Sequence, residues 1–322
     1  MSDRSPPLVT VLGGGGFIGR YVCEALLRSG ARLRVAQRDP RRAWFLQPLG
    51  SVGQVSVTAA DMRRPASIER AVEGADAVVN LVGAFAGDLD AVHVSGARHA
   101  AAAALATGAS AFVHVSAIGA DPHSASRYGR TKGRGEIAVR EAFPNATIVR
   151  PSLVFGAEDQ MTNRFAGLAG LPIMPVIAPK TKFQPVFVRD VGQAVAKAAL
   201  APATYGGKTY DLGGPEVMTM RAMIERIAAM AGRAPAFVDL PDVAASALAS
   251  LGFLPGAPLT KDQWLMLQHD NVAAAGTKGL DAFGIVPTAL ETVAPEWLGR
   301  FVRGGRFAPR PTFTATSNEA NA

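Results

Sequence analysis

The regular alternation of short β-type runs with longer helical stretches constrains the fold of this chain more than any other feature. Short β-type runs predict strands at residues 8–13, 32–38, 54–61, 77–83, 111–117 and 146–156. Stretches with helical character separate them, at about residues 17–29, 65–73, 90–107 and 125–142. Each stretch is long enough to cross over between neighbouring parallel strands. This rhythm predicts an α/β fold with a doubly wound parallel sheet.

Four consecutive glycines, in the segment LGGGGFIGR, lie between the first predicted strand and the first predicted helix. A side chain at Gly13 would obstruct the turn, one at Gly16 a pyrophosphate, and one at Gly19 the packing of helix on strand. Alone, the pattern also fits a flexible turn that binds nothing, but the flanking strand and helix favour phosphate binding at the helix amides. The segment predicts a Rossmann-type dinucleotide site that includes Gly13, Gly15, Gly16, Phe17 and Ile18.

The end of the second predicted strand indicates which dinucleotide is bound. Gln37 and Arg38 replace the acidic residue that usually accepts hydrogen bonds from a ribose 2'-hydroxyl group. Because a guanidinium suits a 2'-phosphate, we expect NADPH in preference to NADH, with Arg38 as the main contact. Arg41 or Arg42 would assist it. Asp39 would take the ribose instead if the strand ended one residue later.

Two further strand ends complete the predicted cofactor site. Asp61, at the end of the third strand, is placed to meet the adenine amino group, although a helix cap before the following MRRP segment fits it equally well. The adjoining residue and the end of the fourth strand add Met62, Val82 and Gly83. The predicted site therefore follows the carboxyl ends of neighbouring strands.

A Tyr-x-x-x-Lys pair, Tyr128 and Lys132, follows the fifth predicted strand, which ends near Ser116. Residues four apart share one face of a helix. A tyrosine titrates at about pH 10, so proton transfer near neutral pH needs a neighbouring cation such as the lysine. An exposed helix pair also fits the motif, but its position after this strand favours a catalytic set of Ser116, Tyr128 and Lys132. The tyrosine and lysine would also hold the nicotinamide ribose, and the serine would hydrogen-bond a substrate carbonyl or alcohol.

Composition and charge argue against several other classes of protein. The net charge is +7, but the basic residues are dispersed and no nucleic-acid-binding motif is recognisable. The five histidines lack metal-ligand spacing and there is a single cysteine, so we expect no metal site. His114 alternates with strand hydrophobes, which predicts a satisfied core residue. The lone Cys23 and the lack of an apolar leader sequence favour a cytoplasmic location.

Several motifs together resemble one family. The segments GGGGFIG, NLVG, YGRTK and RPSLVFG, with Ser116, look like the extended short-chain dehydrogenase/reductase superfamily, in its atypical branch. Within this branch, residues 126–166 and the segment TKFQPVFVRDVGQAV resemble the nucleotide-binding accessory subunit of mitochondrial respiratory complex I and its bacterial relatives. The later segments PLTKDQWLMLQHDNV and GLDAFGIVPTALE extend the likeness, which runs from about Leu8 to Phe301.

The pattern and the resemblance imply a domain organisation. We expect a flexible N-terminus at 1–7, an NAD(P)-binding Rossmann domain at 8–156, a smaller, mostly C-terminal substrate or docking lobe at 157–304, and a flexible tail at 305–322. Residues 185–212 would return to the Rossmann domain through Val188 and Asp190. Pro151 and Leu153, after the sixth strand, would line the nicotinamide pocket.

The resemblance implies two functions, between which the sequence does not decide. In the first, the protein holds NADPH as a structural or regulatory cofactor and docks on a respiratory or quinone-handling complex at the inner face of the membrane. In the second, it is an active NADPH-dependent reductase or epimerase that uses Tyr128 and Lys132 on a quinone-like, isoprenoid or nucleotide-sugar substrate. Arg38 lies where this branch carries its 2'-phosphate-binding arginine, which agrees with the argument from the residues.

Overall fold

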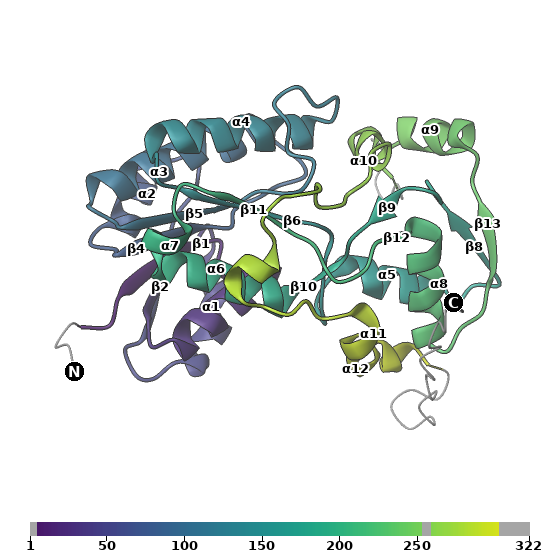
Figure 1. Cartoon of the computed structure of the whole chain (residues 1–322), viewed down its shortest axis with the longest axis horizontal. Helices are drawn as coiled ribbons and strands as arrows, with labels where there is room; N and C mark the ends of the chain where they lie inside the picture. Colours follow the sequence, from purple (N-terminus) through teal and green to yellow (C-terminus); the bar gives the residue numbers. More distant parts are fainter. Residues whose placement is uncertain (1–4, 253–258, 303–322) are drawn as a thin grey trace.

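The computed structural model describes residues 5–252 and 259–302, and its centre is a seven-stranded parallel sheet (Figure 1). The strands of this sheet are β1 (Leu8–Leu12), β2 (Arg32–Gln37), β3 (Val55–Ala59), β4 (Ala77–Asn80), β5 (Ala111–Val115), β6 (Thr147–Pro151) and β11 (Thr209–Leu212). Their order is β11-β6-β5-β4-β1-β2-β3, and each adjacent pair runs parallel. The predicted doubly wound parallel sheet is thus confirmed. The order reverses between β1 and β4, where such sheets open a crevice at the carboxyl ends of their strands.

Helices cover both faces of this sheet (Figure 1). One face carries α1 (Phe17–Arg28) and α6 (Val188–Leu200), and the other carries α2 (Pro65–Val72), α3 (Ala97–Ala106) and α4 (Arg127–Ala142). Successive side chains of a strand point to opposite faces, so Val11 packs in the cluster that includes Val22 of α1, whereas Leu12 packs in the cluster that includes Ala101 of α3. Burying each such aliphatic side chain contributes about 1.5–3 kcal/mol, so both helical layers hold the sheet.

Two predicted elements differ from the structure. The predicted helix at 90–107 begins as a π-helical segment, η2 (Ala91–Gly96), before α3. The predicted strand at 146–156 divides, because β6 ends at Pro151 and β7 (Val154–Phe155) pairs with β10 (Val186–Phe187) outside the main sheet. Between β6 and β7, the Ser152 amide still donates to the carbonyl of Leu212 in β11. The next amide, that of Leu153, donates instead to a side chain outside the sheet.

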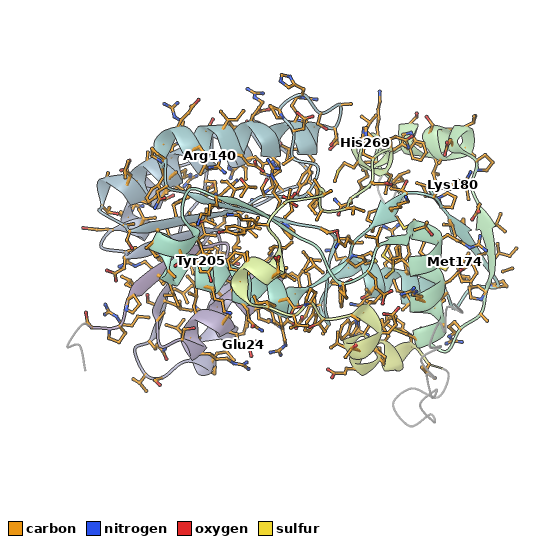
Figure 2. The ribbon with its side chains drawn as sticks, viewed as in Figure 1. Glu24, Arg140, Met174, Lys180, Tyr205 and His269 are labelled. Carbon is orange, nitrogen blue, oxygen red and sulfur yellow. The ribbon has the colours of Figure 1, made fainter. Side chains whose placement is uncertain are left out.

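A smaller lobe lies beyond the carboxyl end of β6 (right in Figure 1). Its strands form two pairs, β8 (Ile173–Val176) with β13 (Ala236–Asp239) and β9 (Lys182–Phe183) with β12 (Met218–Thr219). Its helices are α5 (Gln160–Leu168), α8 (Met220–Met230), α9 (Asp242–Ser250), α10 (Lys261–Leu267), α11 (Leu290–Val293) and α12 (Pro295–Leu298). Met174, labelled in Figure 2, is buried in the core of this lobe with Met223 and Ile227.

The chain crosses between the two parts more than once. After β10 it runs through α6 and α7 (Pro202–Tyr205) into β11, which pairs with β6 in the main sheet. The short helix η3 (Leu280–Phe283) also packs against α7, since Phe283 stacks on Tyr205, with ring centroids 4.6 Å apart. The remaining short helices are η1 (Pro40–Leu49) and η4 (Gly299–Phe301). The predicted tail at 305–322 and the first four residues of the predicted N-terminus lie outside the described residues.

Candidate functional site

A cavity of about 700 Å³ lies at the carboxyl ends of the strands on either side of the switch point between β1 and β4. Its lining includes eight residues of the predicted cofactor site, namely Gly13, Gly15, Gly16, Arg38, Asp61, Met62, Val82 and Gly83. They come from four different strand ends that are far apart in the sequence. The structure therefore brings together the residues that were predicted for the adenosine and pyrophosphate end of a dinucleotide.

The glycine loop presents bare backbone to this cavity. Gly13 has a φ of +82°, which favours glycine, and its amide donates to Ala36 at 2.8 Å. Gly16 is the N-cap of α1, and no side chain of the described residues caps this helix. The first-turn amides, which include those of Phe17 and Ile18, therefore remain available to an anion. A Cβ on Gly19 would lie 2.5 Å from the carbonyl oxygen of Gly14. Glycine at position 19 therefore allows α1 to lie close to the glycine loop, whereas the sequence predicted that it allows the helix to pack on a strand.

Gln37 holds the glycine loop against β2, a role that the sequence did not reveal. Its Oε1 accepts a hydrogen bond from the Gly15 amide at 3.0 Å, and its Nε2 donates to the Asp39 carbonyl at 2.7 Å. A Cβ on Gly15 would lie 2.2 Å from this Oε1, so the glycine leaves room for the glutamine amide. The side chain that replaces the usual acidic residue is thus neutral and already paired.

Two guanidinium groups stand at the same end of the cavity. Arg38 and Arg42 belong to the cavity lining, and Arg38 is exposed. Asp39 also belongs to the lining, but β2 ends at Gln37, and the Asp39 carboxylate caps η1 by accepting from the Arg41 amide at 3.2 Å. The cavity thus offers cationic groups where a 2'-phosphate would lie.

Asp61 is held by its own neighbour. Its carboxylate accepts from Arg63 through the backbone amide, Nε and Nη2, at 3.0, 3.0 and 2.6 Å. These bonds, the side-chain bond above all, lower the pKa of Asp61 to about 2. The alternative prediction of a helix cap is wrong, because the N-cap of α2 is Arg64. The carboxylate stays ionised and lies in the cavity lining, where it can accept a hydrogen bond from an amino group.

Lys132 lies buried beside the end of β4, only 3% exposed. Its Nζ donates to the Val115 carbonyl at 3.0 Å, and a Cβ on Gly83 would lie 3.6 Å from it. Burial lowers the pKa of Lys132 to about 8, while the negative charge of Glu136 raises it. The Glu136 carboxylate is in turn held by Arg150 through two hydrogen bonds, at 2.9 and 2.5 Å.

Tyr128 and Ser116 complete this second group. The Tyr128 ring stacks on the exposed Phe85 ring, with centroids 4.7 Å apart, and burial raises the pKa of Tyr128 to about 12. Ser116 follows β5, and its buried Oγ has no hydrogen-bond partner among the described residues. A buried hydroxyl without a partner is costly, so this atom is a natural contact for a bound ligand.

Pro151 and Leu153 follow β6 beside this group. The Ile118 amide, two residues beyond Ser116, donates to the Pro151 carbonyl at 3.1 Å, so the ends of β5 and β6 are joined. These two residues, with Tyr128, Lys132 and the two helix residues Phe17 and Ile18, fall outside the lining of the 700 Å³ cavity. The predicted adenosine end thus lines the cavity, and the predicted nicotinamide end lies outside its lining.

His93 links the two ends and was missed by sequence reasoning. It is buried in η2, where Nε2 accepts from the Ala84 amide at 3.0 Å and Nδ1 donates to Thr131 Oγ1 at 2.9 Å. Its ring meets the Tyr128 ring edge-on, with centroids 5.6 Å apart. Burial and the charge of Lys132 lower the pKa of His93 to about 3, so the ring is neutral. A histidine inside the apolar AVHVSG run was the available local signal.

His114 is a partial exception to its prediction. It is buried as expected, and its Nδ1 accepts from Asn80 Nδ2 at 3.2 Å. Its Nε2, however, has no partner among the described residues, so the side chain is only half satisfied. Burial lowers the pKa of His114 well below its usual value, which keeps the ring neutral.

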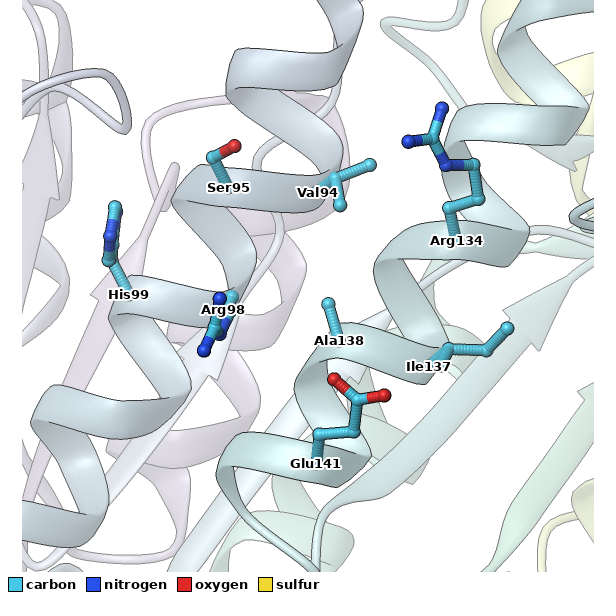
Figure 3. A pocket seen from close by; sticks show the side chains of 8 residues that line it. All are labelled: Val94, Ser95, Arg98, His99, Arg134, Ile137, Ala138 and Glu141. Carbon is cyan, nitrogen blue, oxygen red and sulfur yellow. The ribbon is translucent and has the colours of Figure 1, made fainter.

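A separate groove of about 360 Å³ lies between two helical segments, η2–α3 on one side and α4 on the other (Figure 3). Arg98 and His99 border it on one helix, and Arg134 and Glu141 on the other (Figure 3). Arg134 is already paired with Asp90 at 3.0 Å. The lining contains none of the predicted site residues, so this groove is not part of the candidate cofactor site.

Comparison with known proteins agrees with this geometry. A family model described as NAD(P)H-binding matches residues 13–167. Over 310 residues, the chain is 34% identical to NADH dehydrogenase [ubiquinone] 1 alpha subcomplex subunit 9, mitochondrial, of Rattus norvegicus, covering 93% of this chain and 81% of that protein. The chain belongs to the family of this complex I subunit. Its Rossmann domain is an NAD(P)H-binding domain.

The family also reaches bacterial reductases. The chain is 31% identical over 248 residues to the ceramide reductase of Caulobacter vibrioides, and the alignment covers 75% of this chain and 76% of that protein. Among solved structures, NADPH-dependent quinone oxidoreductase QOR2 of Escherichia coli, complexed with NADPH, superposes with a TM-score of 0.72 at 20% identity. The match covers 89% of this chain and 98% of that chain, and it confirms the Rossmann fold.

Two further observations describe the surroundings of the site. Across residues 5–252 and 259–302, no helix has both the length and the apolar character needed to cross a membrane. Within the same residues, no three histidine, cysteine, aspartate or glutamate side chains gather closely enough to hold a metal ion.

Proposed function

We propose that this protein is an NADPH-holding member of the complex I accessory-subunit family. It retains the dinucleotide as a structural or regulatory cofactor and acts next to a respiratory or quinone-handling complex, peripherally on the inner face of the membrane. The observation that carries the proposal is the 700 Å³ cavity, which is lined by the glycine loop before α1 together with Arg38 and Arg42.

The charges at the end of β2 support NADPH over NADH. A 2'-phosphate would meet Arg38 and Arg42, and Gln37 brings no negative charge. The Asp39 carboxylate caps η1 and lies 4.0 Å from Arg42 Nε, so Arg38 is the main contact. Bonds between a charged donor and a charged acceptor are worth more than neutral ones, about 1.5–3 kcal/mol each. The extra phosphate of NADPH would therefore raise its affinity above that of NADH.

The state of the nicotinamide end supports retention. Burial keeps Tyr128 protonated at neutral pH, since its pKa rises to about 12, and Lys132 is held by the Val115 carbonyl. A neutral phenol and a fixed ammonium group are suitable hydrogen-bond partners for ribose hydroxyls. Tyr128 and Lys132 thus serve as anchors of the nicotinamide ribose without any need for turnover.

Titration of the purified protein with NADPH and NADH tests the cofactor assignment. In Arg38→Glu, NADPH affinity should fall at least about tenfold, because a charged hydrogen bond is lost and a repulsive carboxylate is gained. Arg70→Glu is the matched control, since Arg70 is exposed in the last turn of α2 and lies outside the cavity lining, and it should bind NADPH almost as the unaltered protein does. Equal affinity of both dinucleotides for the unaltered protein would contradict the proposal.

A second candidate function is NADPH-dependent reduction of a carbonyl group. It is favoured by the unpartnered Ser116 Oγ and by the reductases among the relatives. When bound, the dinucleotide supplies a hydride to the carbonyl carbon. Ser116 would donate a hydrogen bond to the carbonyl oxygen, and Tyr128 would transfer its proton to that oxygen as the alcohol forms.

Turnover of a soluble quinone and of a long-chain 3-oxo lipid, each with NADPH, tests this candidate. Tyr128→Phe should abolish turnover and leave NADPH affinity within a few fold, because it removes the proton donor and keeps the ring. No oxidation of NADPH by the unaltered protein with either compound would favour retention. Unchanged turnover in Tyr128→Phe would exclude Tyr128 as the acid.

A further inference from the structure

One segment of the smaller lobe lies against every element that carries a residue of the nicotinamide end. This segment, residues 261–273, consists of α10 and the chain after it, and is called the strap below. Figure 1 shows α10 beside the N-terminal end of α4. The strap contacts α4, the end of β5 and the end of β6, which carry the predicted catalytic and nicotinamide-pocket residues.

Asp262 joins the strap to α4. Its carboxylate accepts from the amides of Arg127 and Tyr128 at 2.5 and 3.0 Å, and from Ser126 Oγ at 3.2 Å. Amides in the first turn of a helix have no partner within the helix, and a negative charge there is stabilising. A carboxylate more than 130 residues away in the sequence thus joins the N-cap residue Ser126 in satisfying the first turn of the helix that carries Tyr128 and Lys132.

Asn271 joins the strap to the ends of β5 and β6. Its Oδ1 accepts from the Leu153 amide at 3.0 Å and from Ser152 Oγ at 2.8 Å, while its Nδ2 donates to the Ile118 carbonyl at 3.2 Å. One side-chain amide therefore bridges the loop after Ser116 to the loop that contains Leu153. No apolar side chain of similar size can make these bonds.

The strap itself is anchored in the smaller lobe. The Asn271 amide donates to the Lys182 carbonyl at 2.8 Å, and the Lys182 amide donates to Asp270 Oδ1 at 2.8 Å. Thr260 and Gln263 form a capping box that fixes the start of α10, and Trp264 is buried beneath it. The strap is thus anchored in the smaller lobe, and its Asp262 and Asn271 side chains both reach the nicotinamide end.

We propose that Asp262 and Asn271 are positioning residues that set the geometry of the nicotinamide half of the cofactor site. This inference rests on the proposed function, because it assigns a determinant of dinucleotide binding. The adenosine half is built by the ends of β1 to β4 and does not touch the strap in the bonds described above. Loss of either side chain should therefore weaken binding of the nicotinamide half selectively.

The test compares NADPH with adenosine 2',5'-bisphosphate, a probe of the adenosine half alone. Asp262→Asn and Asn271→Ala should each raise the dissociation constant of NADPH about tenfold and change that of the bisphosphate less than twofold. Asp242→Asn is the matched control, because Asp242 is an exposed acidic residue on α9 of the same lobe. Equal losses for both ligands, or no loss for either, would overturn the inference.

Hydrogen exchange of the unliganded protein gives a readout that does not depend on the cofactor. Asp262→Asn should speed exchange at the Arg127 and Tyr128 amides, and Asn271→Ala at the Leu153 amide. Unchanged exchange at these amides would overturn the positioning role. If exchange rises as expected but the unaltered protein binds neither ligand, the proposed function fails and the structural role of the strap stands.

Discussion

Replacing His93 with glutamine should make the stability of the protein less dependent on pH between pH 8 and pH 5. His93 is buried, only 1% exposed, with Nε2 accepting from the Ala84 amide and Nδ1 donating to Thr131. Lys132, Tyr128 and His114 are the titratable groups around it. Glutamine keeps an acceptor for the amide but has no proton to gain in this range.

The sign and size of the effect follow from the pKa of His93. Its value is lowered to about 3 in the folded protein, against an ordinary 6.5, so only the unfolded chain binds a proton as the pH falls below 6.5. The contribution of the neutral His93 ring to the free energy of unfolding is fully present above pH 6.5 and is lost progressively as the pH falls toward 3. At pH 5 the loss is about 1.5 pH units at 1.36 kcal/mol each, or about 2 kcal/mol.

Urea unfolding at pH 8 and pH 5 measures this contribution. The unaltered protein should lose about 2 kcal/mol more than His93→Gln between the two conditions, whatever the absolute cost of the substitution. His99→Gln, at an exposed histidine of α3, is the control for removing one histidine. The same loss of stability in the unaltered protein and in His93→Gln would refute the assignment of a buried neutral ring.

Two further substitutions test the packing around the site. Gly19→Ala should destabilise the protein by about 1–3 kcal/mol and weaken NADPH binding, because the new Cβ would clash with the Gly14 carbonyl oxygen. Gly299→Ala is the control for thermal unfolding and should be nearly neutral, since a Cβ there has no atom within 4 Å. Arg150→Met should cost about 2–3 kcal/mol in urea unfolding at pH 7, because it leaves the buried Glu136 carboxylate unpaired. Adding Glu136→Gln should recover part of that loss, and no recovery would contradict the ion-pair explanation.

The sheet was predictable because its information is local. The predicted strands at 8–13 and 32–38 match β1 and β2 within one residue at each end, and β1 reads as the largely apolar run expected of a parallel strand covered on both faces. The division between β6 and β7 coincides with Arg150, Pro151 and Ser152, which interrupt the apolar run, and the predicted strand did not take this signal into account. The bond from the Leu153 amide to Asn271, which is 118 residues away, has no local signal in the sequence.

The residues of the candidate site likewise fall into those with a local sequence signal and those without one. The glycine loop, Arg38 and the Tyr128–Lys132 pair have fixed spacings to neighbouring elements, so the sequence predicts them. His93 and Asp262 have no such spacing, because their partners lie 38 and 134 residues away, at Thr131 and Tyr128. Contacts of this kind depend on how distant elements pack, and the local patterns of the sequence do not show that packing.

The most direct test of the account is to denature the freshly purified protein and to identify and quantify the nucleotide that is released. The account predicts nearly one NADPH per chain from the unaltered protein and little from Arg38→Glu. An empty protein that binds NADPH only weakly and reversibly would contradict a retained cofactor. That result would favour an exchanging cosubstrate and a reductase that uses Tyr128 as its acid.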